Sequence, residues 1–197
     1  MEVLQDNLCL ILDLEGFFTH GKFFHVRELG YYTWNQEHGR HAFFIPIPYK
    51  ALNDKDRNTF HFVCTKIHGL SYQPTQDEHA YHPMLLKSLV KKLYQKYKTN
   101  TRTVVGYKGG HVEKDLLQTL NIPSLNLETL GCPKYDVLRT QFPSESLLPS
   151  CGFHKDDKLH HCFLEMVSNL VSFCVIIDFR EMWWGSTLMG NPKVKKN

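Results

Sequence analysis

The sequence predicts one α/β domain built around a mixed β-sheet with helices on its faces. The chain has 197 residues, of which 42% are hydrophobic, so it can bury a single sizeable core. Three strand-like segments come first, and after residue 80 helical and strand-like segments alternate, which is typical of mixed sheets. No repeat or low-complexity tract interrupts the sequence. We therefore expect one domain over residues 1–184, followed by a flexible basic tail over residues 185–197.

The first part of the chain predicts an antiparallel start to the sheet. We expect strands over residues 9–14, 23–34 and 41–47. The glycine-bounded stretch 16–21 separates the first two of them. A helix is expected over residues 54–67, because Asp54 can serve as its N-cap and apolar residues follow at helical spacing. A polar loop follows over residues 72–79.

The second part of the chain alternates helices with strands. One helix is indicated by an apolar stripe that contains Leu85, Leu86, Leu89, Val90, Leu93 and Tyr94. We then expect a strand over residues 103–107, a helix over 111–120 after a Gly-Gly turn, and a strand over 124–127. A loop over residues 143–157 precedes a long apolar helix or helix pair over 159–184. The order β-β-β-α-β-α-β-α resembles that of a ribonuclease H-like domain.

Two carboxylates share one face of the first strand. Residues 10–16 form an apolar run in which Asp13 and Glu15 point the same way, because strand side chains alternate with a period of two. Like charges this close repel each other, and burying either one without a partner is costly. A divalent metal ion is the most economical partner. The alternative is an edge strand that carries two solvated acids.

Further acidic residues can reach this strand from other elements. Asp115 follows an expected strand and the Gly-Gly turn, while His160 and Glu165 lie five positions apart in the last helix. With Asp13 and Glu15, they resemble the Asp-Glu-Asp-Asp motifs and catalytic histidine of the DnaQ-like exonuclease superfamily. Asp115 matches the second motif and Glu165 the last, a position at which that superfamily normally has aspartate.

The resemblance implies a phosphodiesterase that degrades single-stranded RNA or DNA, with RNA favoured, as a 3′–5′ exonuclease. In that superfamily one divalent ion, Mg²⁺ or Mn²⁺, activates water and a second stabilises the leaving oxygen, while the histidine is the general base. The ions would be held here by Asp13, Glu15, Asp115 and Glu165. His160 would be the base.

The same resemblance implies where the substrate lies. In those exonucleases the residues directly after the first motif contact the terminal nucleotide, which points to Gly16 and Phe17. His161 can exchange roles with its neighbour His160. For Asp115 and Glu165 the alternative is a solvated acid on a helix surface.

A second group of residues has the spacing of zinc ligands. Cys151 and His154 form a C-x2-H pair, and Cys162 follows eight positions later, so three good zinc ligands fall close together. The alternatives are that Cys162 belongs to the core and Cys151 is an idle loop thiol. Cys132 can also replace one of the three ligands.

Glu28 completes this group. Strand alternation places Glu28 on the same face as Phe24 and Val26, where a carboxylate needs a partner. The order Glu-Cys-His-Cys, with C-x2-H-x7-C spacing, resembles the zinc set of the Maelstrom domain, itself a DnaQ-like fold. The resemblance implies a structural Zn²⁺, single-stranded RNA and protein partners of a small-RNA (piRNA) silencing pathway. Because many animal members of that family lack the nuclease carboxylates, a catalytically inactive RNA-binding or adaptor module is the alternative function.

Composition and charge restrict the possible functions less than these motifs do. A formal net charge of +3 permits a polyanionic partner without requiring one. A basic stripe on the helix near residue 90 either contacts phosphates or is a solvated face, and it comprises Lys87, Lys91, Lys92, Lys96, Lys98 and Arg102. No apolar run approaches 18 residues and the start does not resemble a secretory signal, so we expect an intracellular protein, in cytoplasm or nucleus, with no membrane partner.

Overall fold

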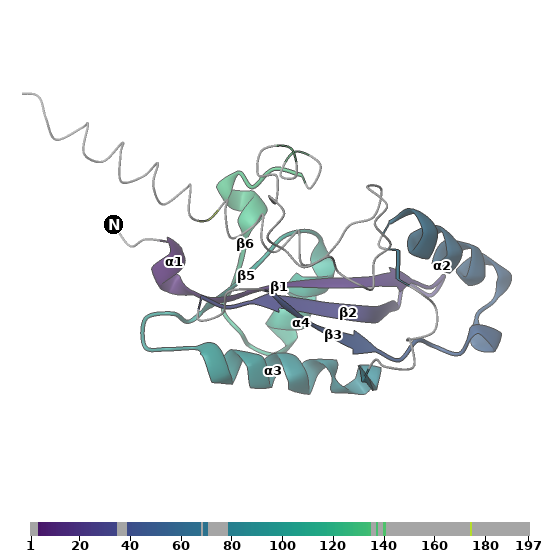
Figure 1. Ribbon diagram of the computed structural model, residues 1–197, viewed down its shortest axis with the longest axis horizontal. Helices are drawn as coiled ribbons and strands as arrows, with labels where there is room; N and C mark the ends of the chain where they lie inside the picture. The colour runs from purple at the N-terminus through teal and green to yellow at the C-terminus, as the bar shows by residue number, and fades with distance from the viewer. Residues whose placement is uncertain are drawn as a thin grey trace, which may run out of the picture.

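Six strands form one mixed sheet in the order β4-β3-β2-β1-β5-β6 (Figure 1). The computed structural model describes residues 4–34, 39–67, 69–70 and 79–134, together with residues 137, 140 and 174. The strands are β1 (Leu8–Phe18), β2 (Phe24–Tyr32), β3 (Arg40–Phe44), β4 (Ala80–Tyr81), β5 (Val104–Tyr107) and β6 (Ser124–Asn126). β1, β2 and β3 are antiparallel neighbours, whereas β5 pairs parallel with β1, β6 with β5, and β4 with β3.

Helices connect and cover these strands. The α-helices are α1 (Leu4–Asn7), α2 (Asp54–Lys66), α3 (Leu86–Tyr97) and α4 (His111–Thr119). Short 3-10 helices occupy Tyr49–Ala51, Pro83–Leu85 and Leu127–Leu130. Within the described part of the chain, no helix is both long and apolar enough to cross a membrane.

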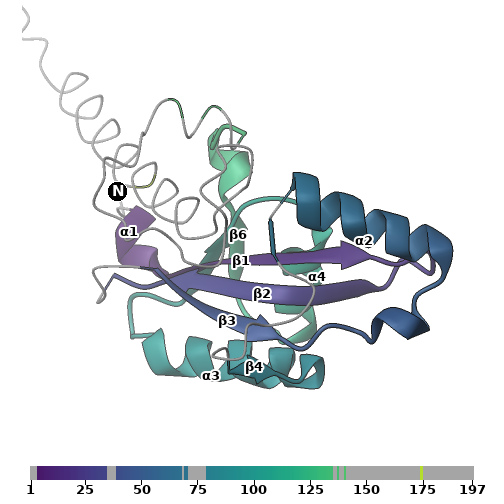
Figure 2. The ribbon, with the colours of Figure 1, turned by 45° about the vertical axis from the view of Figure 1, so that its right-hand side comes forward.

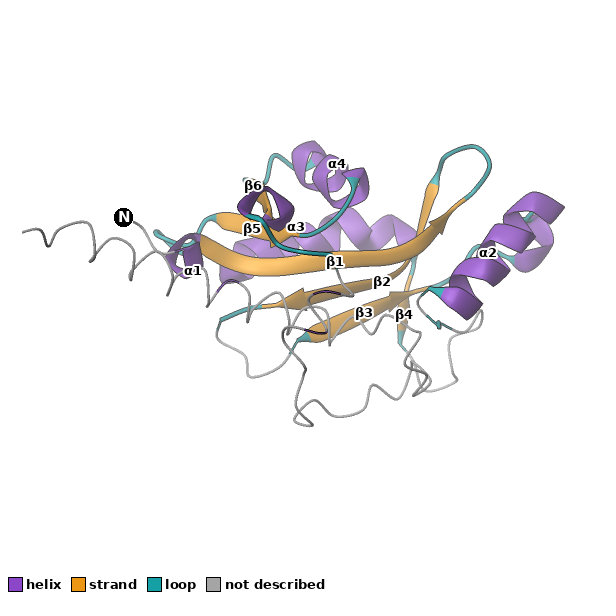
Figure 3. Ribbon diagram, turned by 90° about the horizontal axis from the view of Figure 1, so that it is seen from above, coloured by secondary structure: helices purple, strands orange, loops and turns teal. Residues whose placement is uncertain are grey.

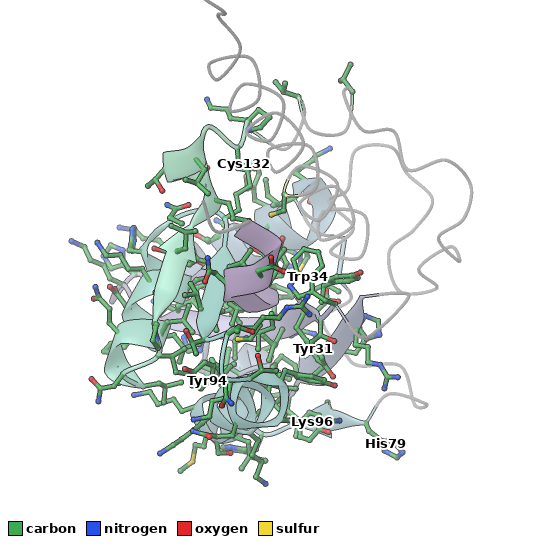
Figure 4. All side chains as sticks on the ribbon, turned by 90° about the vertical axis from the view of Figure 1, so that its left-hand side faces the viewer. Tyr31, Trp34, His79, Tyr94, Lys96 and Cys132 are labelled. Atoms are coloured by element: carbon green, nitrogen blue, oxygen red, sulfur yellow. The ribbon has the colours of Figure 1, made fainter. Side chains whose placement is uncertain are left out.

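The main core lies between the sheet and the pair α3 and α4, which cover the same face (Figure 3). Alternation in β1 turns Leu10, Leu12 and Leu14 toward this face. They pack with buried residues of the two helices, namely Val90, Leu93, Leu116 and Leu117. The lysines of the basic stripe that lie on α3 are exposed, and Figure 4 shows Lys96 and Tyr94 on different sides of this helix.

A smaller core anchors α2 near the end of β1. Figure 2 shows α2 above the arrowhead of this strand. Phe17 of β1 packs there with Leu52 and with Phe60 of α2. The N-cap of α2 is Asn53, whose side chain accepts a hydrogen bond from the Asp56 N–H at 2.9 Å. Asp54, the expected cap, is instead the first residue inside the helix.

The order of the described elements confirms the predicted mixed α/β sheet flanked by helices. Helices and strands fall within a few residues of their expected ranges. β4 was not predicted, because two residues at the edge of a sheet carry too little pattern to recognise. β1 extends well past the expected end at residue 14, to Phe18. The expected loop over 143–157, the helix over 159–184 and the tail over 185–197 lie outside the described residues.

Candidate active site at the end of β1

β1 extends well beyond the end of its parallel neighbour β5. β5 ends at Tyr107, which pairs with Leu12, whereas β1 continues to Phe18. The order of the strands also reverses at β1. The strands that directly follow it in the chain lie on one side of it, whereas β5 and β6 lie on the other side. Ligands of open α/β sheets bind at such a switch point, outside the carboxyl ends of the parallel strands.

Three carboxylates occupy one face of β1 and β2 at this place. Asp13 pairs with Gly30, and Glu15 pairs directly with Glu28, so the three side chains share a face. Asp13 is only 6% exposed and Glu28 is fully buried, while Glu15 is half-buried. The burial of Asp13 does not fit a solvated edge strand.

A β-bulge changes the expected neighbours of Glu28. The register between β1 and β2 shifts between Glu15 and Gly16, so Val26 is opposite Gly16. Phe24 and Val26 consequently join the core on the α3 and α4 side. Glu28 therefore does not share their face, which corrects the prediction from simple alternation.

Gly16 is required by this close approach of the two strands. A Cβ atom added there would collide with the backbone carbonyl oxygen of His25 and would lie 2.7 Å from Cζ of Phe24. Its role in this structure is to permit the bulge beside Glu15.

A fourth carboxylate reaches the site from α4. Glu113 is 5% exposed, and its Oε1 accepts a hydrogen bond from the Leu14 N–H at 3.2 Å. The last β1 residue that pairs with β5 is Leu12, so the Leu14 N–H has no acceptor on that strand. The Glu113 carboxylate accepts its hydrogen bond instead.

Asp115, the acid expected from the sequence, is not brought to Asp13. It is exposed on α4, and the structure places Glu113 there instead. A sequence signal for this exists: on a helical wheel Glu113 lies within the stripe of Leu116 and Leu117, whereas Asp115 lies on the opposite side. An acid centred in an apolar stripe needs a buried partner, and this pattern was missed.

Burial and mutual repulsion both disfavour the charged form of the carboxylates in this site. The pKa of Asp13 is raised well above its ordinary value, first by burial and then by the negative charges of Glu15, Glu113 and Glu28. Burial likewise raises the pKa of Glu113. Each described charged group that acts on Asp13 is thus a carboxylate, the ligand type that Mg²⁺ and Mn²⁺ prefer. Among the described residues, however, no group of three or more His, Cys, Asp or Glu side chains is close enough together to hold a metal ion.

Glu28 has a nitrogen neighbour that the sequence did not indicate. Its Oε1 lies 3.1 Å from Nδ1 of His41 on β3. The other expected zinc ligands, Cys151, His154 and Cys162, lie outside the described residues. Cys132, the alternative ligand, is buried, and burial raises the pKa of its thiol to about 11, which keeps it protonated.

Both expected substrate residues, Gly16 and Phe17, lie on β1. Phe17 is 2% exposed and packs edge-on against Phe60, with ring centroids 5.2 Å apart, so it cannot stack on a base. The neighbouring Phe18 is 41% exposed. His160 and Glu165 lie outside the part of the chain that the structure describes.

Comparison with known proteins gives information about the fold. No protein-family model matches the chain, and no curated protein sequence matches it significantly. Among solved structures, the chain is similar to the Mopeia virus exonuclease domain partially complexed with manganese, with 19% identity and a TM-score of 0.54 over 88% of this chain and 79% of that one. The same domain fully depleted of manganese gives 16% identity and a TM-score of 0.51 over 87% and 77%. At these identities the similarity shows the fold alone. It confirms the ribonuclease H-like fold, and neither the Maelstrom domain nor a zinc set is part of it.

Proposed function

We propose that this protein is a divalent-metal-dependent nuclease that hydrolyses single-stranded RNA or DNA, as a 3′–5′ exonuclease. The observation that carries the proposal is the burial of Asp13 among three other carboxylates at the open end of β1. Such a site is unfavourable by itself and becomes favourable when a divalent cation neutralises it. The fold, shared with an exonuclease domain that binds manganese, supports the proposal.

The proposal assigns a role to each residue of the site. Asp13, Glu15 and Glu113 would hold Mg²⁺ or Mn²⁺, and we propose Glu165 as a further ligand and His160 as the general base. A divalent ion supplies Lewis acidity and lowers the pKa of water. Glu113 replaces Asp115 in this set, and its hydrogen bond to the Leu14 N–H fixes the carboxylate against β1.

A structural zinc remains a second proposal. Cys151, His154 and Cys162 would supply three ligands, and Glu28 the fourth. The complete burial of Glu28 supports this, because a buried carboxylate needs a positive partner. His41, 3.1 Å away, is the competing partner.

A binding module without catalysis is the second candidate function. It is favoured by the absence, among the described residues, of a preassembled group of three metal ligands. In this reading the fold binds single-stranded RNA and serves as an adaptor in small-RNA silencing inside the cell, in cytoplasm or nucleus.

The deciding experiment is degradation of a 5′-labelled single-stranded RNA with Mn²⁺ or with EDTA. Wild-type protein is compared with Asp13→Asn and with the control Asp54→Asn, whose carboxylate is exposed and paired with Arg57. A ladder that shortens from the 3′ end, lost with EDTA and in Asp13→Asn alone, establishes the nuclease and its polarity. Retained RNA binding without cleavage by the wild type favours the adaptor. Equal cleavage by Asp13→Asn contradicts the active-site assignment.

A further inference from the structure

A pocket of about 550 Å³ opens between the β1–β2 hairpin and the start of α4. In Figure 3 the hairpin loop rises beside α4, with α2 on its other side. The lining includes Phe18, Lys22, Phe24, His111, Val112 and Asp115. Val112 of this lining directly precedes Glu113 along α4.

One wall of the pocket is aromatic. The ring of Phe18 lies 5.1 Å from that of Phe24 and 6.2 Å from that of His111, measured between centroids. Since Phe18 is exposed, its ring remains available for a planar ligand. Aromatic side chains of this kind form stacking platforms for unpaired bases.

The rim carries one positive charge in an unusual backbone conformation. Lys22 has φ of 61°, in the left-handed region that residues other than glycine and asparagine rarely adopt. The turn that holds it is closed by hydrogen bonds from the Thr19 N–H to the Phe23 carbonyl oxygen, at 3.0 Å, and from the Lys22 N–H to the Thr19 carbonyl oxygen, at 2.8 Å. Strained positions of this kind persist at binding sites, where the side chain is used. An ammonium group there suits a phosphate.

Asp115 supplies the opposite charge. Within the described part of the chain its carboxylate has no hydrogen-bond or ion-pair partner, and only its backbone carbonyl accepts, from Thr119. The side chain is therefore not needed to hold α4 together. It is positioned to accept hydrogen bonds from a ligand in the pocket.

We propose that this pocket binds one unpaired nucleotide, with guanine preferred over uracil, and that Asp115 is the specificity-determining residue. The two oxygens of a carboxylate match the adjacent N1–H and N2–H donors of guanine. Adenine and cytosine present one donor beside an acceptor, whereas the N3–H of uracil is flanked by two carbonyl oxygens. The proposal rests on the proposed function for the nature of the ligand, and it gives Asp115 a role outside the metal site.

The test measures binding without cleavage. Guanosine, adenosine, cytidine and uridine 5′-monophosphates are titrated into the protein in EDTA, and dissociation constants come from NMR chemical-shift changes. We expect guanosine monophosphate to bind about tenfold more tightly than the uridine nucleotide, the order expected of one bidentate contact. Asp115→Asn should abolish that ratio, whereas Asp54→Asn should keep it. Equal affinities in the wild type, an unchanged ratio in Asp115→Asn, or shifts outside the pocket would overturn the proposal.

Lys22→Gly provides an independent check. Glycine relieves the left-handed backbone and removes the ammonium group, so the variant should melt at a higher temperature yet bind all four nucleotides more weakly. Unweakened binding would refute the role of Lys22. Base preference without any RNA cleavage would support the pocket and contradict the nuclease, while cleavage without base preference would do the reverse.

Discussion

Replacing Glu113 with glutamine tests the carboxylate site most directly. The side chain keeps its length and an amide oxygen that can accept the hydrogen bond from the Leu14 N–H, now 3.2 Å long. Only the negative charge is lost. In metal-free protein this removes the desolvation cost of one buried carboxylate and its repulsion on Asp13, both of which oppose folding at neutral pH.

The size of the effect follows from electrostatics. Two unit charges about 5–8 Å apart repel by roughly 2–3 kcal/mol at an effective dielectric constant of about 20. The raised pKa of Asp13 reduces its share of this repulsion, so we expect Glu113→Gln to raise the free energy of unfolding in EDTA by about 1–2 kcal/mol. For a chain of this length that corresponds to about 2–8 °C in melting temperature.

Manganese should reverse the order. A ligand at one hundred times its dissociation constant stabilises the native state by about 2.7 kcal/mol. The wild type should gain this amount, whereas the variant, which lacks one ligand charge, should gain much less. Thermal unfolding of the wild type, Glu113→Gln and Asp54→Asn is measured with EDTA and with Mn²⁺. Each variant is compared with the wild type in each condition. A variant that is less stable than the wild type in EDTA, or that gains as much from Mn²⁺, would refute the reasoning.

Four further outcomes can be measured. The pKa values of Asp13 and Glu113 are raised in the folded protein, so without metal their contribution to stability is fully present below the unfolded pKa of about 4 and is lost as the pH rises through the folded pKa. Urea unfolding in EDTA across about pH 4–8 should show this loss of stability. Mn²⁺ should make the loss smaller. Phe17→Ala should lower the free energy of unfolding by about 3–5 kcal/mol, because it empties the core under α2. Phe18→Ala should cost less than about 1 kcal/mol in the same urea titration and instead weaken nucleotide binding. Cys151→Ser should lower zinc content, measured by metal analysis, together with melting temperature, and an unchanged zinc stoichiometry would contradict the zinc proposal.

The fold was predictable because its signals are local. The apolar stripe that predicts α3 and the β-rich run around Asp13 each occupy a few consecutive residues, and the chain order of such elements restricts the topology. β4 escaped prediction because its two residues acquire strand character only by pairing with β3. The shift at Gly16 was equally invisible, since a bulge depends on how two strands approach each other and not on the composition of either.

The candidate site was only partly predictable, for a related reason. Asp13 and Glu15 are recognisable within their own strand, but the choice between Glu113 and Asp115 depends on which side of α4 meets the end of β1. The helical wheel answers this once Leu116 and Leu117 are taken to define the buried side. Proximity in sequence to a motif is thus weaker evidence than phase within the helix.

The length difference between β1 and β5 connects these observations. Because β5 stops opposite Leu12, the Leu14 N–H, which points to the side where β5 would continue, must find a partner outside the sheet. Glu113 meets this need and in doing so brings its charge toward Asp13. A neutral acceptor would satisfy the backbone equally well without adding to the repulsion that raises the pKa of Asp13. The presence of a carboxylate at a position where an amide would be more stabilising is therefore an argument that the charge itself is used, and a divalent cation is the partner that makes it favourable.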